Sequence, residues 1–361
     1  MMTWLFLLMG LAVLVCGAEL LVRGASRLAL GWGVSPLVVG LTIVAFGTST
    51  PELAVSLKAA WANHPDLVLG NCVGSNIFNI LFILGICALI SPLIVLQQLV
   101  RIDVPIMIGV HIVLLLFAYN STIGPLEGFL FILCLIAYTA FVVYKSKQES
   151  ETVVKEYNDT YSISLKNAKF KNTKSIVYVL LGLGLCVIGA GWMTDSAVAI
   201  ARALGLSELV IGLTIIAAST SIPEVATSVV ATIRGQRDIA IGNVVGSNIF
   251  NVLGIIGITS LVSPHEITVA PSVISFDIPV ALACCVACLP IFFTEHKITR
   301  GEGVLFLGYY VAYISYLLLS AAKHDSLPLF NQTMFLFVIP LTFITLFILA
   351  YRAFKVKKHS Q

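Results

Sequence analysis

Long apolar segments alternate with short polar ones along the whole chain. Runs of about 20 apolar residues recur, and an α-helix needs this length to cross the hydrocarbon core of a bilayer. The pattern predicts an all-α polytopic membrane protein with about eleven transmembrane helices. The predicted helices lie near residues 2–22, 36–60, 67–90, 104–119, 125–144, 175–198, 208–232, 239–262, 276–294, 302–321 and 333–351.

The composition leaves too little polar surface for a soluble globule. Of the 361 residues, 58% are hydrophobic and 11% are charged, whereas a soluble domain carries about 25% charged residues. When the loops are alternated between the two sides of the membrane, 18 of the 21 Lys and Arg residues fall on one side.

This charge asymmetry predicts the orientation of the chain. Cytoplasmic loops carry the excess of Lys and Arg, so we expect the N-terminus outside and the C-terminus in the cytoplasm. The expected location is the plasma membrane, which is the inner membrane in a Gram-negative bacterium, with the lipid bilayer as surroundings. The net charge of +3 then reflects topology and predicts no nucleic-acid partner.

One stretch of the sequence occurs twice along the chain. Residues 40–85 return as residues 212–257 without an insertion or deletion. The first motif, Gly-Leu-Thr-Ile-Val-Ala-Phe-Gly-Thr-Ser-Thr-Pro-Glu, ends at Glu52 and its second copy ends at Glu224. The second motif, Leu-Gly-Asn-Cys-Val-Gly-Ser-Asn-Ile-Phe-Asn, ends at Asn79 and returns ending at Asn251, with 9 of 11 positions identical. Polar residues duplicated inside apolar segments are typical of transporters built from internal repeats.

The duplication divides the chain into two halves. Residues 1–144 are predicted to form a first repeat of five helices and residues 175–321 a second. Because five is odd, the second repeat enters the membrane from the opposite side, so the repeats are inverted. Residues 145–174 are interpreted as a solvated cytoplasmic linker, in preference to a regulatory ion-binding domain, because their acidic residues lack Ca²⁺-loop spacing. Residues 322–361 add one further helix and a basic cytoplasmic tail.

The first motif combines a helix break with oxygen-bearing side chains. Pro51 removes a backbone donor and clashes with the preceding turn, and Gly47 lies just before it, so the helix should break and free carbonyls around Ala45 and Phe46. Carbonyl, hydroxyl and carboxylate oxygens are ligands suited to Na⁺ or Ca²⁺. The side chains in question are Thr48, Ser49 and Glu52, repeated as Thr220, Ser221 and Glu224 beside Pro223.

The second motif supplies a facing polar stripe. Asn71, Ser75 and Asn79 follow a four-residue spacing that places them on one helix face, and the same spacing recurs in Asn243, Ser247 and Asn251. Glycines four residues apart, Gly70 with Gly74 and Gly242 with Gly246, would let helices approach closely. A carboxylate at mid-bilayer costs at least about 2.5 kcal/mol, so two glutamates at equivalent positions predict an ion site at the membrane midplane built from both repeats.

Other polar residues within the apolar segments have simpler interpretations. His111 is expected to be a hydrogen-bonded core histidine. Asp103 and Asp277 begin helices, where capping or the helix dipole would account for them. The cysteines at 284, 285 and 288 have no adjacent His or acid and are interpreted as small buried hydrophobic residues.

Both motif pairs resemble the α-repeats of the calcium/cation antiporter superfamily, most closely the bacterial and archaeal branch of the sodium/calcium exchanger family. The resemblance covers ten of the eleven predicted helices. It implies a monomeric transport unit, without a cofactor, that exchanges Ca²⁺ for Na⁺ by alternating access. It also implies that Glu52 and Glu224 bind both ions. The other ligand positions implied are Thr48, Ser49, Ser75, Asn79, Thr220, Ser221, Ser247 and Asn251, with backbone carbonyls at Ala45 and Ala217.

Two departures from the family pattern change these expectations. Ala218 and Ser219 stand where the first copy has Phe46 and Gly47, so the second helix is expected to break less freely. Position 251 is Asn, where some microbial members carry Asp. Potassium-dependent relatives usually carry an acid in this region, so its absence argues against K⁺ coupling.

Three other functions are alternatives to sodium-driven exchange. A Ca²⁺/H⁺ or other cation/proton exchanger of the same superfamily is the main alternative, although the proton branch usually has a different acid motif. A channel fits less well, because inverted halves around a midplane site suit a carrier. An intramembrane serine hydrolase at Ser75 or Ser247 would need a nearby base, and His111 cannot serve two equivalent serines. The chain is therefore predicted to be a transporter and not an enzyme.

Overall fold

The structure is a bundle of helices with two very short strand pairs. A computed structural model describes residues 2–161, 168–204, 217–293, 297–322, 324 and 326–340. Several helices contain a π-helical turn, labelled η. The first half consists of α1 (Met2–Trp32), α2 (Pro36–Val39), η1 (Gly40–Val44), α3 (Ala45–Thr48), α4 (Thr50–Trp61), α5 (Pro65–Phe78), η2 (Asn79–Ile83), α6 (Leu84–Ile90), β1 (Leu93–Ile94), η3 (Leu99–Asp103), α7 (Val104–Ala118), β2 (Thr122–Ile123) and α8 (Pro125–Tyr161).

The second half repeats this order. It consists of α9 (Ala168–Ala203), α11 (Ala217–Ser219), α12 (Ile222–Ile233), α13 (Arg237–Phe250), η5 (Asn251–Ile256), α14 (Gly257–Val262), β3 (Ile267–Thr268), η6 (Val273–Asp277), α15 (Ile278–Phe293), β4 (Lys297–Ile298) and α16 (Arg300–Ala321), followed by α17 (Leu327–Thr333) and η7 (Met334–Val338).

The described helices are long and apolar enough for a polytopic membrane protein. Seven of them could each cross a bilayer, and the bent pair Pro36–Thr48 and Thr50–Trp61 forms an eighth. Two shorter apolar helices, Ile222–Ile233 and Val273–Leu289, coincide with further predicted segments. The predicted all-α polytopic membrane class is confirmed. Parts of the predicted helices at 208–232 and 333–351 lie outside the described residues.

The segment interpreted as a solvated linker is largely helical where the structure describes it. Helix α8 continues beyond the apolar run to Tyr161, and α9 begins at Ala168. Each of these two helices therefore extends a membrane-length apolar segment with a polar one. The intervening residues 162–167 lie outside the described part of the chain.

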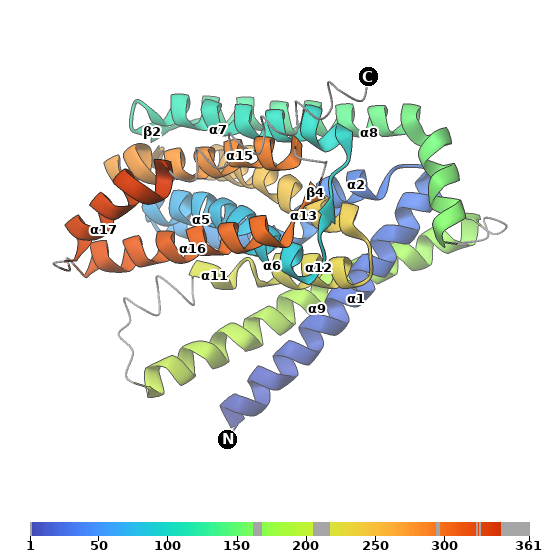
Figure 1. Cartoon of the computed structure of the whole chain (residues 1–361), viewed down its shortest axis with the longest axis horizontal. Helices are drawn as coiled ribbons and strands as arrows, with labels where there is room; N and C mark the ends of the chain where they lie inside the picture. Colours follow the sequence, from blue (N-terminus) through green and yellow to red (C-terminus); the bar gives the residue numbers. More distant parts are fainter. Residues whose placement is uncertain are drawn as a thin grey trace.

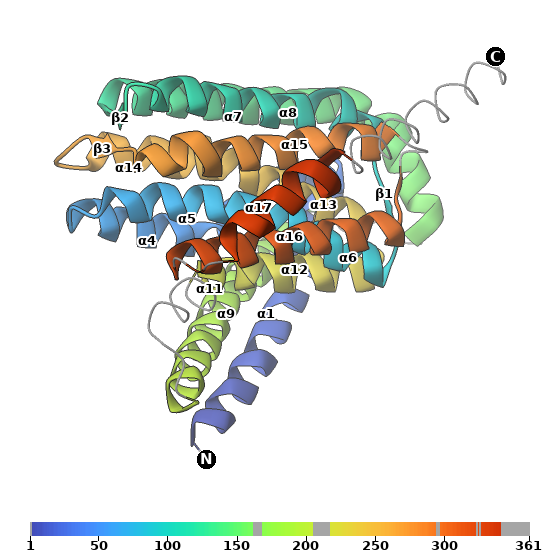
Figure 2. The same cartoon turned by 60° about the vertical axis from the view of Figure 1, so that its left-hand side comes forward.

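Most helices stack in layers, and one pair crosses beneath them. Figures 1 and 2 show α7 and α8 on one side, α14 and α15 in the next layer, and α4 and α5 below these. Helices α1 and α9 lie antiparallel and project away from the bundle towards the N-terminus. A Cβ on Gly17 would lie 2.8 Å from the Gly182 carbonyl oxygen, and one on Gly182 would lie 2.7 Å from that of Gly17. These glycines allow the backbones of α1 and α9 to meet.

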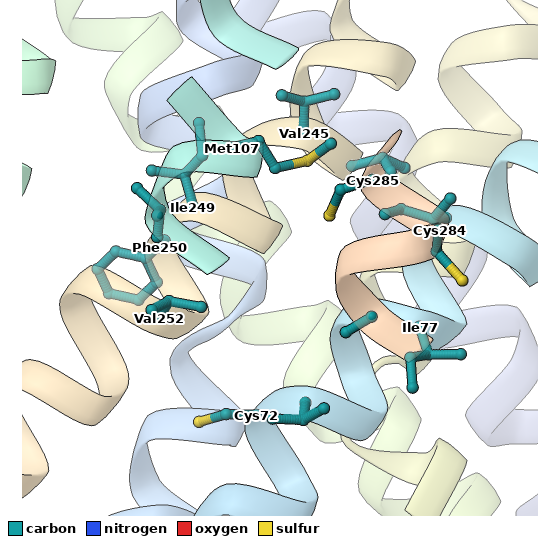
Figure 3. Packing of buried hydrophobic residues seen from close by; sticks show 14 of the residues in the cluster. Cys72, Ile77, Met107, Val245, Ile249, Phe250, Val252, Cys284 and Cys285 are labelled. Atoms are coloured by element: carbon teal, nitrogen blue, oxygen red, sulfur yellow. The ribbon is translucent and has the colours of Figure 1, made fainter. Parts of the chain in front are cut away.

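The interior is organised around α5 and α13. The most apolar window of Arg237–Val262 is wholly buried, whereas very little of that of Arg300–Ala321 is buried and most of its residues are half-buried. Figure 3 shows side chains of α5, α7, α13 and α15 packed together, including Met107 and Val245. The exposed faces of the outer helices carry large apolar side chains such as Leu116 and Leu126. An apolar surface of this kind is suited to lipid.

Two strand pairs join the halves of the chain. β1 pairs antiparallel with β4, placing Leu93 opposite Ile298. β2 pairs antiparallel with β3, placing Ile123 opposite Ile267. Each pair takes one strand from each half, so these connections tie the ends of helices from both repeats together.

Some polar residues differ from their interpretation in the sequence. Asp103 makes no side-chain capping hydrogen bond, and its Oδ1 instead accepts from Tyr138 Oη at 3.1 Å. In the second half, Asp277 Oδ1 accepts from Tyr313 Oη at 3.2 Å. The capping expectation for Asp103 was wrong, because the helical segment already begins at Leu99 and the carboxylate accepts from Tyr138 on α8 and, at 3.4 Å, from Gln98 Nε2. His111 is fully buried and hydrogen-bonded, as expected.

Candidate cation site

The first duplicated motif breaks its helix at Ser49. The runs Pro36–Thr48 and Thr50–Trp61 meet at an angle of 43°, and Ser49 between them has φ −82° and ψ 9°. Pro51 is the second residue of α4, where its missing backbone donor does not interrupt a helix already begun. The break predicted from Gly47 and Pro51 is confirmed.

The second copy of the first motif also breaks its helix, at the equivalent residue Ser221. Ser221 has φ −89° and ψ 8°, close to the values of Ser49, and α12 likewise has Pro223 as its second residue. The exchange of Gly47 for Ser219 therefore does not remove the break. Ala217, whose carbonyl is implied by the resemblance, is the first residue of α11.

The carbonyls at the first break are partly satisfied within the same segment. The Ala45 carbonyl oxygen accepts from Ser49 N at 3.0 Å, and Thr48 Oγ1, which gives its hydrogen to Asn243, lies 3.4 Å from it. The Phe46 carbonyl oxygen accepts from Thr50 Oγ1 at 3.2 Å. The expectation that the break leaves both carbonyls free is therefore wrong. The polar atoms still open to a ligand are mainly side-chain oxygens.

The two glutamates are held by serines from the opposite repeat. Glu52 and Glu224 are 1% and 0% exposed. Ser221 Oγ donates to Glu52 Oε1 at 2.8 Å, and Ser49 Oγ donates to Glu224 Oε1 at 3.0 Å. Each carboxylate therefore contacts the helix break of the other repeat. The structure thus brings the two predicted acids together in the interior.

The asparagines at 71 and 243 brace the broken helices. Asn71 Nδ2 donates to the Glu52 carbonyl at 3.1 Å, while its Oδ1 accepts from Thr220 Oγ1 at 3.3 Å. Asn243 Nδ2 lies 3.5 Å from the Glu224 carbonyl, while its Oδ1 accepts from Thr48 Oγ1 at 3.1 Å. Each threonine therefore gives its hydrogen to an amide oxygen of the other repeat and keeps the lone pairs of its hydroxyl oxygen. These contacts join the repeats and orient the glutamates.

Several buried oxygens of the predicted site have no hydrogen-bond partner among the described residues. A buried polar atom without a partner is costly unless something absent from the protein chain satisfies it. Carboxylate, amide and hydroxyl oxygens are ligands that hard cations prefer. The unpartnered oxygens in the two motif pairs are Glu52 Oε2, Glu224 Oε2, Asn79 Oδ1, Asn251 Oδ1, Ser247 Oγ and Asn248 Oδ1.

Ser75, the other serine predicted from the second motif, contacts the glutamate group through Ser221. Ser75 Oγ lies 3.1 Å from Ser221 Oγ, and because Ser221 gives its single hydrogen to Glu52, the Ser75 hydroxyl is the donor in this contact. Ser75 is 2% exposed. Asn79 follows Ser75 by one helical turn, as Asn251 follows Ser247. The second motif therefore faces the glutamates as its spacing predicted.

Close helix packing brings the second motif of one repeat against the first motif of the other. A Cβ on Gly246 would lie 2.4 Å from the Leu41 carbonyl oxygen, and one on Gly242 would lie 2.7 Å from that of Leu37. Helix α13 consequently packs directly on α2 and η1. The close approach predicted for this glycine pair is confirmed.

Two polar residues outside the expected ligand set adjoin the site. Asn251 Nδ2 donates to Asn76 Oδ1 at 2.9 Å, and Asn76 Nδ2 lies 3.0 Å from His111 Nε2. Asn76 belongs to the duplicated second motif, which is the signal that singled it out. His111 lies outside the repeated motifs, and only its position in an apolar segment pointed to it.

The fold and the two motif pairs identify the family. The model of the family described as sodium/calcium exchanger protein matches residues 2–144 and 174–319. The chain belongs to this family of membrane antiporters. It is therefore a transporter and not an enzyme, and the serine hydrolase interpretation is ruled out.

Relatives match along nearly their whole length. The chain is 35% identical over 342 residues to the sodium/calcium exchanger MaX1 of Methanosarcina acetivorans, covering 86% of this chain and 97% of MaX1. It is 33% identical over 317 residues to the inner membrane protein YrbG of Escherichia coli, covering 86% and 95%. A solved structure of the sodium-calcium exchanger NCX_Mj superposes with a TM-score of 0.74 at 30% identity, covering 87% of this chain and 98% of that one.

Proposed function

We propose that this protein exchanges Ca²⁺ for Na⁺ across the membrane by alternating access at a midplane site built from both repeats. The observation that carries the proposal is the group of unpartnered buried oxygens around Glu52 and Glu224. The proposed ligands are Glu52, Glu224, Thr48, Ser49, Thr220, Ser221, Ser75, Ser247, Asn79 and Asn251, with the carbonyls of Ala45 and Ala217. The names of MaX1 and NCX_Mj, both sodium/calcium exchangers, support the choice of ions.

The charge of the site explains why the two ions would compete. Two carboxylates balance one Ca²⁺ or two Na⁺, and neutral amide and hydroxyl oxygens can take part in holding either cargo. Ca²⁺ takes six to eight oxygen ligands, which the side chains from both repeats can supply together. Because the ions share ligands, one must leave before the other binds. Two carboxylates buried close together repel each other when no cation lies between them. Because this repulsion raises the free energy of the closed, empty site, an empty carrier reorients less readily than a loaded one.

The proposed architecture has eleven transmembrane helices, of which ten form two inverted repeats. The antiparallel packing of α1 with α9 supports the inversion, as do the strand pairs β1–β4 and β2–β3. The proposed divisions are residues 1–144 and 175–321 for the repeats, 145–174 for a cytoplasmic linker, and 322–361 for the extra helix and tail.

The excess of Lys and Arg on one side supports a plasma-membrane protein with an external N-terminus and a cytoplasmic C-terminus. A single chain brings both glutamates to one site, which supports a monomeric transport unit.

Transport by purified protein in sealed liposomes tests the proposal. Uptake of ⁴⁵Ca²⁺ should follow an outward Na⁺ gradient and should not follow K⁺ or pH gradients of equal size. Glu52→Gln and Glu224→Gln should each abolish this uptake. A matched control is Glu19→Gln, because the Glu19 carboxylate instead pairs with Arg23 and Arg234.

Two outcomes would contradict the proposal. Uptake driven by a pH gradient and not by Na⁺ would favour the proton exchanger. Wild-type transport by either glutamine variant at position 52 or 224 would show that the transported ion binds elsewhere.

A further inference from the structure

A chain of hydrogen bonds outside the proposed ligand set runs from α7 to Asn251. The buried ring of His111 lies with Nδ1 2.8 Å from the Met107 carbonyl oxygen and Nε2 3.0 Å from Asn76 Nδ2. Asn76 Oδ1 in turn accepts from Asn251 Nδ2 at 2.9 Å. His111, Asn76 and Asn251 are each at most 1% exposed. Three helical segments, α7, α5 and η5, therefore meet through one polar chain in an apolar interior.

Backbone carbonyls set the direction of every bond in this chain. A carbonyl oxygen only accepts, so His111 Nδ1 carries the hydrogen that bonds to Met107. The neutral imidazole then has its lone pair on Nε2, which accepts from Asn76 Nδ2. The Asn248 carbonyl oxygen also accepts from Asn76 Nδ2, at 3.3 Å. Asn76 is therefore held with Nδ2 towards these two acceptors and Oδ1 towards Asn251.

The direction of the chain decides which atom Asn251 presents to the site. Because Asn251 Nδ2 donates to Asn76, its Oδ1 is turned away from Asn76, and this oxygen has no hydrogen-bond partner among the described residues. An amide turned the other way would present its NH₂ group, which repels a cation. We propose that His111 is a positioning residue that acts through Asn76 to hold Asn251 with its oxygen towards the transported cation. The proposal rests on the cation site described under the proposed function.

The two repeats differ at this point. His111 lies eight residues after Asp103, and Cys285 lies eight residues after Asp277, so Cys285 is the equivalent residue in the second repeat. Asn248, the counterpart of Asn76, donates its Nδ2 to the Val244 carbonyl in its own helix at 2.8 Å. Its Oδ1 is left without a partner in the described part of the chain. The imidazole and the amide that hold Asn251 thus come from the first repeat, and the equivalent residues of the second repeat, Cys285 and Asn248, do not hold Asn79 in this way.

Cys285 also packs against His111 itself. Its Sγ lies 3.6 Å from Nδ1 and 3.9 Å from Nε2. Figure 3 shows Met107, Val245 and Cys285 converging from α7, α13 and α15. Removing this sulfur would loosen the packing of the ring but leave its bonds to Met107 and Asn76 in place. Cys285→Ala is therefore a matched control for packing alone.

The test compares two replacements of His111 in purified, reconstituted protein. His111→Gln can keep an acceptor for Asn76 and a donor for Met107, whereas His111→Leu keeps neither. The readout is the Ca²⁺ concentration at half-maximal exchange, measured separately from the maximal rate. Loss of a residue that orients a metal ligand typically costs about tenfold to a hundredfold in metal affinity. We expect a rise of that size in His111→Leu, largely reversed in His111→Gln, with little change in Cys285→Ala.

The outcomes separate this proposal from the proposed function. Equal Ca²⁺ dependence in the Leu and Gln variants, or an equal rise in Cys285→Ala, would overturn the positioning role and leave the exchange activity standing. Absence of Na⁺-driven Ca²⁺ uptake in the wild type would overturn the exchange function itself.

A second measurement does not require His111→Leu to fold. The measurement is NMR of ¹⁵N-histidine-labelled protein, in which the signal that disappears in His111→Gln is assigned to His111. Its ¹⁵N chemical shifts should be those of a neutral ring protonated at Nδ1. A ring protonated at Nε2 would contradict the proposal.

Discussion

Ser49 Oγ donates a hydrogen bond to Glu224 Oε1 at 3.0 Å, although the two residues belong to different copies of the repeated motif. Ser221 makes the reciprocal bond to Glu52 at 2.8 Å. Both serines lie at the break of their own helix, where the backbone departs from helical geometry. The break therefore does more than interrupt a helix, because it turns a hydroxyl towards the acid of the other repeat.

Removing either hydroxyl should weaken cation binding. A hydrogen bond to a charged group contributes about 1.5–3 kcal/mol, so Ser49→Ala and Ser221→Ala should each raise the half-maximal Ca²⁺ concentration about tenfold or more. Ser26→Ala is the control, since Ser26 Oγ donates only to the Val22 carbonyl of its own helix. Flux assays with varied Ca²⁺ measure the change. Unchanged Ca²⁺ dependence in both variants would show that the serines do not support the carboxylates.

Replacing Thr48 and replacing Thr50 should affect stability and exchange to very different extents. Thr48 is buried and donates to Asn243 Oδ1 at 3.1 Å in the other repeat, whereas Thr50 is exposed and donates to the Phe46 carbonyl in the preceding helix α3. Thr48→Val would leave a buried amide oxygen without its donor, which costs about 1–3 kcal/mol. We expect a lower unfolding temperature and slower exchange for Thr48→Val, with Thr50→Val close to wild type. Similar losses in both would place the effect in local helix propensity.

The contact between α1 and α9 should tolerate no added methyl group. Gly17→Ala would put a Cβ 2.8 Å from the Gly182 carbonyl oxygen, and overpacking of this kind costs about 1–3 kcal/mol. Gly184→Ala on α9 is the control, because a Cβ there meets no described atom within 4 Å. Thermal unfolding in detergent should separate the two variants. Equal stability would mean that the helices can move apart without cost.

The buried pair of Tyr138 and Asp103 should contribute to stability. Tyr138 Oη donates to Asp103 Oδ1 at 3.1 Å, and Asp103 is fully buried. Tyr138→Phe removes a donor from a buried carboxylate, at a cost of about 1–3 kcal/mol in the free energy of unfolding. Tyr119→Phe is the control, since Tyr119 is 83% exposed. The prediction fails if denaturant unfolding gives the two variants the same stability.

Much of the site could be predicted because the repeat marks it twice. Glu52 and Glu224 stand out as acids in apolar segments at equivalent positions, and the helix break follows from Pro51 and Gly47. Side chains four residues apart on one helix share a face, so the grouping of Ser247 with Asn251 also follows from spacing. These inferences need only local geometry and the cost of burying charge.

The pairing between repeats could not be predicted in the same way. Spacing along one helix does not say that Ser49 serves Glu224 instead of Glu52, because that depends on how two distant segments dock. For the same reason the sequence predicts a helix cap at Asp103, whereas its carboxylate accepts from Tyr138 on α8. His111 is a single unrepeated residue, and its link to Asn251 passes through a side chain on a third segment.

The exchange of serines between the two copies bears on how such a chain could have arisen. A polypeptide with a single copy of the motif would carry the glutamate, but the serine that donates to this glutamate would come from a second molecule. Two separately synthesised halves would have to associate in the bilayer before either glutamate gained its serine partner. Fusion of the two genes would make this association intramolecular.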